Sequence, residues 1–158
     1  MNPGVKLAKD FVRAHPLAVL ATLNEQGFPE TAAVYCALDD DLSVYFLSAS
    51  RTRKVDNIDR SPMVSLTFID ETSMSTLQVQ GSALSIATPV EAVYFEAVPS
   101  AVVEELLTLH TQFKDITPAF NTGGPVQFFI RIKPTWMRLA DFRSITADQS
   151  KIYTQIVG

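Results

Sequence analysis

The fold is decided by residues 17–50, which read LAVLATLNEQGFPETAAVYCALDDDLSVYFLSAS. Three apolar runs in this stretch, 17–23, 31–38 and 43–48, are rich in Val, Leu, Tyr and Phe, and Gly, Pro, Asn and Asp stand between them. Apolar runs bounded by residues that favour turns are typical of β-strands. The stretch therefore predicts three consecutive antiparallel strands joined as a meander.

Strand composition returns later in the chain. Segment 63–69 alternates apolar and polar residues and predicts a fourth strand, and segment 75–87 predicts a longer fifth one. Gly81 inside that fifth strand predicts a bulge or a close approach of two backbones. Residues 126–142 have the composition of a sixth and last strand.

Helical patterns occur at three places, 4–14, 51–60 and 89–113, and Pro99 divides the last pattern in two. No βαβ order and no glycine-rich nucleotide loop occurs in the sequence, which disfavours a Rossmann fold. Closing six strands into a barrel removes their exposed edges. The sequence therefore predicts one domain over 1–158 of mainly β (α+β) class, a six-stranded antiparallel β-barrel with peripheral helices.

The composition narrows the class of partner. The chain has 13 basic and 17 acidic side chains and a net charge of −4, which argues against nucleic acid and an anionic membrane and favours a small-molecule ligand. The single Cys36 excludes an internal disulfide and a cysteine zinc site, and it favours a cytoplasmic location. Because Cys36 lies in an apolar run, we expect it to be buried. No apolar run approaches the roughly 18 residues that span a bilayer, and no signal-peptide pattern is visible.

Three cations stand at the start of the helix predicted at 51–60. Arg51, Arg53 and Lys54 precede the acidic residues of this helix, and Thr52 can serve as its N-cap. Because the peptide dipoles already place positive charge at a helix N-terminus, cations there are unfavourable unless an anion binds. The pattern therefore predicts a phosphate site. The alternative interpretation is a solvated basic turn, neutralised by acids of the helix or of a neighbouring loop.

Five short motifs follow one another along the chain: 22–29 (TLNEQGFP), 46–48 (FLS), 52–54 (TRK), 57–58 (NI) and 62–66 (PMVSL). Together, over residues 5–87, they resemble the pyridoxamine 5′-phosphate oxidase-like, FMN-binding split-barrel family. The resemblance implies a split β-barrel, bound FMN, and a two-fold homodimer with FMN at its interface. The 47% hydrophobic content also favours a dimer, which would cover an otherwise exposed strand at 126–142.

The resemblance implies which residues hold the FMN phosphate. Arg53 and Lys54 would contact the phosphate directly, Ser48 and Thr52 would add hydroxyl groups, and Arg51 would be an outer cation. The charge order alone predicts an anion at the same helix start.

Three groups of residues would surround the ribityl chain and the ring. The backbone of the second strand would contribute Ala33, Val34, Tyr35 and Cys36. The fifth strand would contribute Thr76 and Gln78, although Thr76 stands where the true oxidases have glutamine. The partner's last strand would contribute Trp136, Arg138 and Phe142. The other interpretation of Trp136 is a core residue.

The resemblance implies an FMN-dependent oxidoreductase, such as a flavin or quinone-type reductase that uses NAD(P)H and acts on an unidentified small molecule. The chain lacks the C-terminal R-x-R-L-x-P segment of the true oxidases, so we do not expect vitamin B6 phosphate as its substrate. Two alternatives stay open: a flavin- or haem-binding protein without turnover, and a deazaflavin-dependent reductase on the same fold. His15 and His110 lack metal-ligand spacing and a visible partner, so we expect surface or helix-end roles for them.

Overall fold

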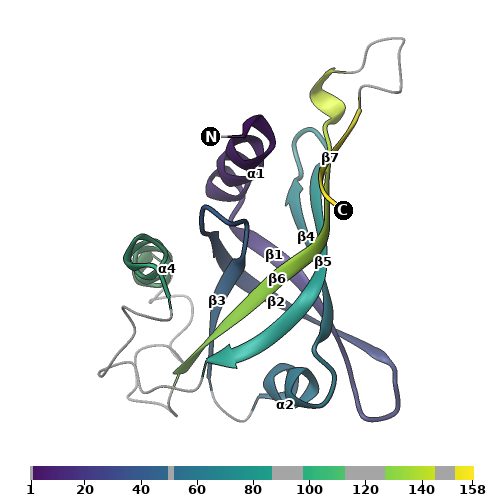
Figure 1. Ribbon diagram of the computed structural model, residues 1–158, viewed down its shortest axis with the longest axis vertical. Helices are drawn as coiled ribbons and strands as arrows, with labels where there is room; N and C mark the ends of the chain where they lie inside the picture. Colours follow the sequence, from purple (N-terminus) through teal and green to yellow (C-terminus); the bar gives the residue numbers. More distant parts are fainter. Residues whose placement is uncertain (1, 50–51, 87–97, 113–126, 145–151) are drawn as a thin grey trace.

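The computed structural model describes residues 2–49, 52–86, 98–112, 127–144 and 152–158. Within these residues, seven strands form one antiparallel sheet in the order β3-β2-β1-β4-β5-β6-β7, and β3 also pairs with β6. This additional pairing closes six of the strands into a barrel, whose crossing strands are visible in Figure 1. The predicted six-stranded antiparallel barrel with peripheral helices is confirmed.

The strands lie close to the segments that the sequence predicts. They are β1 (Leu17–Leu23), β2 (Pro29–Leu38), β3 (Val44–Ala49), β4 (Met63–Asp70), β5 (Ser75–Ile86), β6 (Gln127–Ala140) and β7 (Tyr153–Val157). The first three pair as the expected meander, with Leu17 opposite Tyr35 and Cys36 opposite Phe46. Only β7 has no counterpart among the predicted strands.

The turn between β1 and β2 fixes the position of the predicted phosphate site. Gly27 has a φ of 82°, a backbone conformation that glycine adopts without steric cost. Asn24 Oδ1 accepts a hydrogen bond from the amide of Phe28 at 2.9 Å across the same turn. The resulting register places Thr22 opposite Glu30. Because directly opposed residues of an antiparallel pair project from the same face, the turn brings these two side chains together.

Two helices close the ends of the barrel. Figure 1 shows α1 (Pro3–Ala14) and α2 (Arg53–Arg60) at opposite ends of the strands. Phe11 of α1 and Val55 and Ile58 of α2 belong to the same buried apolar cluster as the inward side chains of the strands. Because burial of apolar surface is the main stabilising term, α2 is held against the barrel by its apolar side. Its first residue remains exposed.

A third helix, α4 (Ser100–Gln112), covers part of the outside of the barrel. Its Val102 and Leu106 pack in a second apolar cluster with Tyr45 of β3 and Phe129 of β6. The expected helix start at Ser100 is confirmed. The helix that was expected before Pro99 lies outside the described residues.

The strand expected at 126–142 is not left open. Along one side β6 pairs with β5, and along the other it pairs with β3 up to Ile132 and with β7 from Met137. Among the exposed apolar side chains, one group lies on the outside of β1 and β4. There Leu17, Val19 and Ile69 are 47%, 44% and 43% exposed.

Gly81 lies where two strands approach closely. The register between β5 and β6 shifts between Gln80 and Gly81. A Cβ atom at Gly81 would stand 2.3 Å from the carbonyl oxygen of Lys133. The predicted bulge with close backbone approach is therefore confirmed.

None of the helices in the described part of the chain is both long enough and apolar enough to cross a bilayer.

Candidate functional site

The first turn of α2 has the features of an anion site. Thr52 is the N-cap residue, but its side chain forms no capping hydrogen bond, and its Oγ1 lies 3.2 Å from Ser48 Oγ instead. The first amides of the helix are therefore not capped by Thr52 and can bind a ligand. Arg53 and Lys54 follow directly. Of the five residues expected to hold a phosphate, only Arg51 lies outside the described residues.

A cavity of about 580 Å³ adjoins this turn. Strands β1 and β2 and the start of α2 line it, through Thr22, Glu30, Thr31, Ala32, Thr52, Arg53 and Lys54. The lining contains two cations and one carboxylate. The cavity is thus large enough for a phosphate with an attached chain, and its formal charge is positive.

Glu30 is the carboxylate of this cavity, and three side chains hold it. Its Oε1 pairs with Arg53 Nη2 and accepts a hydrogen bond from Asn24 Nδ2 at 3.2 Å, and its Oε2 accepts one from Asn57 Nδ2 at 3.0 Å. The hydrogen bonds from Asn57 and Asn24, together with the charge of Arg53, hold the pKa of Glu30 below its usual value. Glu30 is therefore an anion at neutral pH. Arg53 is thus paired with a carboxylate of β2, not with an acid of its own helix.

Lys54 differs from Arg53. It is half-buried, and among the described residues it forms no ion pair. Burial lowers the pKa of Lys54 because the charged form loses contact with water. An anion in the cavity would offset this loss, so Lys54 is a cation in position to bind a ligand.

A second cavity, of about 650 Å³, lies on the outer side of β1, β2 and β4; we call it the outer groove. Its apolar lining includes Leu17, Val19, Ala33, Tyr35 and Ile69. Ala33 directly follows Ala32 of the first cavity, so adjacent residues of β2 line both. From Thr31 to Tyr35 the strand extends over about 13 Å. The two cavities thus lie beside neighbouring stretches of the same strand.

The edge of β2 beside these cavities is open. Among the described strands, β3 pairs only with Cys36, Ala37 and Leu38 of β2. The preceding residues, 30–34, pair with β1 along one edge and have no strand partner along the other. Their backbone groups on that edge can bind a ligand, which is how the resemblance implies that the ring is held.

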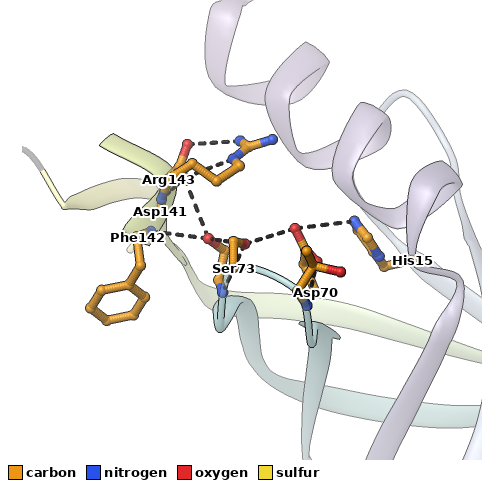
Figure 2. A network of polar contacts seen from close by, with 8 residues as sticks. His15, Asp70, Ser73, Asp141, Phe142 and Arg143 are labelled. Carbon is orange, nitrogen blue, oxygen red and sulfur yellow. Dashed lines mark hydrogen bonds and ion pairs between the residues drawn. The ribbon is translucent and has the colours of Figure 1, made fainter. Parts of the chain in front are cut away.

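One end of the outer groove is polar (Figure 2). His15 Nε2 lies 3.8 Å from Asp70 Oδ2, and Ser73 Oγ donates a hydrogen bond to the same oxygen at 2.7 Å. The hydrogen bond from Ser73, followed by the amide of Thr72 and the nearby His15, keeps the pKa of Asp70 low. His15 is the C-cap residue of α1, so the expected helix-end role is confirmed. Its acidic partner and its place at the groove were not expected.

Two of the predicted ring residues point away from the cavities. Val34 and Cys36 face the apolar interior of the barrel. Cys36 is free and fully buried, and burial raises the pKa of its thiol. The expectation that Cys36 is a buried residue is confirmed. Only the backbone of these two residues can take part in a ligand site.

The remaining predicted residues, Ser48, Thr76, Gln78, Trp136 and Phe142, line neither cavity. Gln78 Oε1 accepts a hydrogen bond from Arg138 Nη2 at 3.3 Å. The guanidinium of Arg138 lies 5.1 Å from the ring centre of Trp136 and 4.6 Å from that of Tyr153. Trp136 is half-buried and lies outside both apolar clusters, so it is not a core residue. A contribution of Trp136, Arg138 or Phe142 to a partner's site stays a prediction.

Three residues with a role at these cavities were not expected from the sequence: Glu30, Asn57 and Asp70. A signal existed for the first two, since Arg53 and Asn57 are one helical turn apart and the β1–β2 turn sets the register of Glu30. No local signal connects Asp70 with His15, because the pairing of β1 with β4 brings together residues that are far apart in the sequence.

Comparison with known proteins identifies relatives of the whole domain. The profile of the pyridoxamine 5′-phosphate oxidase family matches residues 5–140. A pyridoxine/pyridoxamine 5′-phosphate oxidase from Crocosphaera subtropica is 26% identical over 132 residues, which cover 73% of this chain and 62% of that protein. The chain thus spans less than two thirds of the length of this curated relative.

Solved structures share the fold. A pyridoxamine 5′-phosphate oxidase-related, FMN binding protein from Nostoc punctiforme matches with a TM-score of 0.66 at 13% identity, covering 98% of this chain and 96% of that one. HutZ, the haem storage protein from Vibrio cholerae, matches with a TM-score of 0.58 at 18% identity, covering 82% and 88%. The family profile extends over most of the barrel, and the TRK motif at 52–54 lines the cavity at α2. The chain belongs to the pyridoxamine 5′-phosphate oxidase family.

Proposed function

We propose that the protein is an FMN-dependent oxidoreductase. The observation that carries the proposal is the cavity at the first turn of α2, where Arg53, Lys54 and an uncapped helix N-terminus converge. A helix N-terminus with basic side chains is a strong phosphate site, because amides, dipole and cations act on the same charge. The FMN-binding description of the Nostoc punctiforme structure supports the same class of ligand.

The residues present fit the parts of FMN. Arg53 and Lys54 would neutralise the phosphate, and the hydroxyl group of Thr52, which Ser48 Oγ contacts from the buried side, would donate to it. The open edge of β2 would hydrogen-bond the ring, and the apolar lining of the outer groove would exclude water from it. When bound, FMN supplies the two-electron chemistry, and the protein positions it. NAD(P)H as reductant and a flavin or quinone as acceptor belong to the same proposal, as does a cytoplasmic location.

A two-fold homodimer is part of the proposal. Leu17, Val19 and Ile69 are half-exposed apolar side chains that line the outer groove. A second copy over this face would bury them and would cover a bound ring. Trp136 and Phe142 would then act on the partner's ligand. Because each site would need both copies, FMN binding and dimer formation would strengthen one another.

Titration with FMN and with riboflavin, which lacks the phosphate, tests the proposal. We expect FMN to bind at least about a hundredfold more tightly, because the phosphate adds charge-assisted contacts with Arg53 and Lys54 of at least ~1.5 kcal/mol each. Quenching of flavin fluorescence measures both affinities. Equal affinities for the two flavins contradict the phosphate site. Oxidation of NAD(P)H by the loaded protein, with a quinone as acceptor, tests the reductase part separately.

Haem binding is the second candidate, because His15 lines the outer groove and haem iron takes a histidine ligand. A haem storage protein shares the fold. Addition of haemin to the purified protein and to His15→Ala separates the two candidates. A Soret band that shifts in the variant supports haem, whereas FMN binding that is unchanged in the variant supports the first candidate.

A further inference from the structure

The cavity that we assign to the phosphate contains a carboxylate, Glu30. Its Oε1 pairs with Arg53, one of the two cations of the cavity. A like charge beside a bound anion weakens its binding. The carboxylate therefore opposes the ligand that the rest of the cavity favours, and its position needs a physical reason.

Glu30 is fixed more firmly than Arg53. Its side chain is 22% exposed, against 82% for that of Arg53. Asn24 and Asn57 donate hydrogen bonds to Glu30 at 3.2 Å and 3.0 Å, and Asn57 is itself held by Thr22 at 3.0 Å. When a ligand arrives, the carboxylate stays in place, and the guanidinium of Arg53 is the group that can change partners.

A ligand anion can take Arg53 away from Glu30 only if it interacts more strongly with the cavity than Glu30 does. A carboxylate or chloride offers a single charge, which Arg53 already has from Glu30. A phosphate monoester brings a charge of about −1.5 to −2 and three acceptor oxygens at neutral pH. It can therefore engage Arg53, Lys54 and the first amides of α2 together.

We propose that Glu30 sets the affinity of the cavity for anions: this built-in carboxylate occupies Arg53, so an anion binds well only when it also engages Lys54 and the first amides of α2. A phosphate monoester makes these additional contacts, and they outweigh its repulsion by Glu30. The inference rests on the proposed function, since it concerns the same anion site.

The test is Glu30→Gln, which removes the charge and keeps the shape of the side chain. Glu25→Gln, at an exposed position in the turn of the same hairpin, is the matched control. We expect Glu30→Gln to bind FMN and inorganic phosphate roughly fivefold more tightly, since one screened like charge is removed. Riboflavin affinity should not change. Acetate should gain less affinity than the phosphate ligands in this variant, because Glu30 repels a single charge about half as strongly as a dianion.

Weaker FMN binding by Glu30→Gln, at unchanged riboflavin affinity, overturns the proposal, because Glu30 would then serve only to position Arg53. Glu30→Ala is the second variant, because it places no new donor beside Asn24 and Asn57. It must show the same gain in affinity for FMN and inorganic phosphate. If the wild-type protein binds FMN no better than riboflavin, the proposed function fails. Tighter binding of inorganic phosphate by both variants would still support the role of Glu30. No gain with either phosphate ligand overturns it.

Discussion

Asn57 of α2 lies against Thr22 of β1, with its Nδ2 3.0 Å from Thr22 Oγ1. The two residues are 2% and 3% exposed, so this is a buried polar contact between a helix and the barrel wall. The same Nδ2 also donates to Glu30 at 3.0 Å. Asn57 thus connects the position of α2 with the charge arrangement of the anion cavity.

Replacing Asn57 by alanine should lower the free energy of unfolding by about 2 kcal/mol, because Thr22 loses its donor and Glu30 keeps a charge with fewer hydrogen bonds. Urea unfolding of the variant measures the effect. Asp59→Ala, at an exposed position of the same helix, is the control and should change little. Equal effects of the two substitutions would mean that the Asn57 contact contributes nothing to stability.

Gly81→Ala should destabilise the barrel by at least about 2 kcal/mol, because the added Cβ overpacks a close contact between backbones. The Cβ would stand 2.3 Å from the carbonyl oxygen of Lys133, so β5 and β6 would have to move apart. Thermal unfolding compares this variant with Ser82→Ala, at the exposed next position. A melting temperature equal to that of Ser82→Ala would show that the strands do not approach this closely.

Asp141 should make stability depend on pH in the acid range. Hydrogen bonds from Arg143, at 2.8 Å and 2.7 Å, lower the pKa of Asp141 to about 2 from its usual 3.8 (Figure 2). Because the folded pKa is the lower one, the ionised carboxylate stabilises the fold above about pH 4, and this contribution is lost as the pH falls towards about 2. The pair is partly exposed, so we expect a loss of only about 1 kcal/mol.

Urea unfolding of the wild-type protein and of Asp141→Asn at several pH values checks this dependence. The difference in unfolding free energy between the two proteins should shrink from about pH 4 to about pH 2. A difference that stays constant over this range would show that Asp141 and Arg143 are not paired in solution.

Val19→Glu should disrupt the proposed homodimer while leaving the barrel folded. Val19 is 44% exposed and lines the outer groove, so a charge there does not disturb the core but would be buried in the dimer. Sedimentation equilibrium with and without FMN measures the association. Leu84→Glu, at a 53% exposed position outside the groove, is the control. A wild-type monomer that binds FMN tightly contradicts both the dimer and the shared site.

Much of the barrel could be predicted because local signals agree with the final structure. The apolar runs of β1 to β3 are separated by strong turn residues, and β4 alternates clearly between buried and exposed positions. β7 could not be predicted in this way. Its side chains are exposed or half-buried, and it is a strand because of its pairing with the second half of β6.

The anion site could be predicted in part for the same reason. The order of charges at the start of α2 is local, so the sequence indicates Arg53 and Lys54 directly. The pairing of Arg53 with Glu30 joins residues 23 positions apart and depends on the β1–β2 register. The outer groove forms only when β1, β2 and β4 lie side by side in the sheet. The same arrangement brings His15 next to Asp70.

The central claim is that the cavity at α2 holds the FMN phosphate, and the ratio of FMN to riboflavin affinity in Arg53→Ala/Lys54→Ala tests it most directly. Each lost charge-assisted contact should weaken FMN binding by at least ~1.5 kcal/mol, whereas riboflavin binding should not change. Lys133→Ala, an exposed cation on β6, is the control and should keep the wild-type ratio. The double variant should therefore bind the two flavins almost equally. If both affinities fall by the same factor, or if the preference for FMN persists, the phosphate does not bind at Arg53 and Lys54.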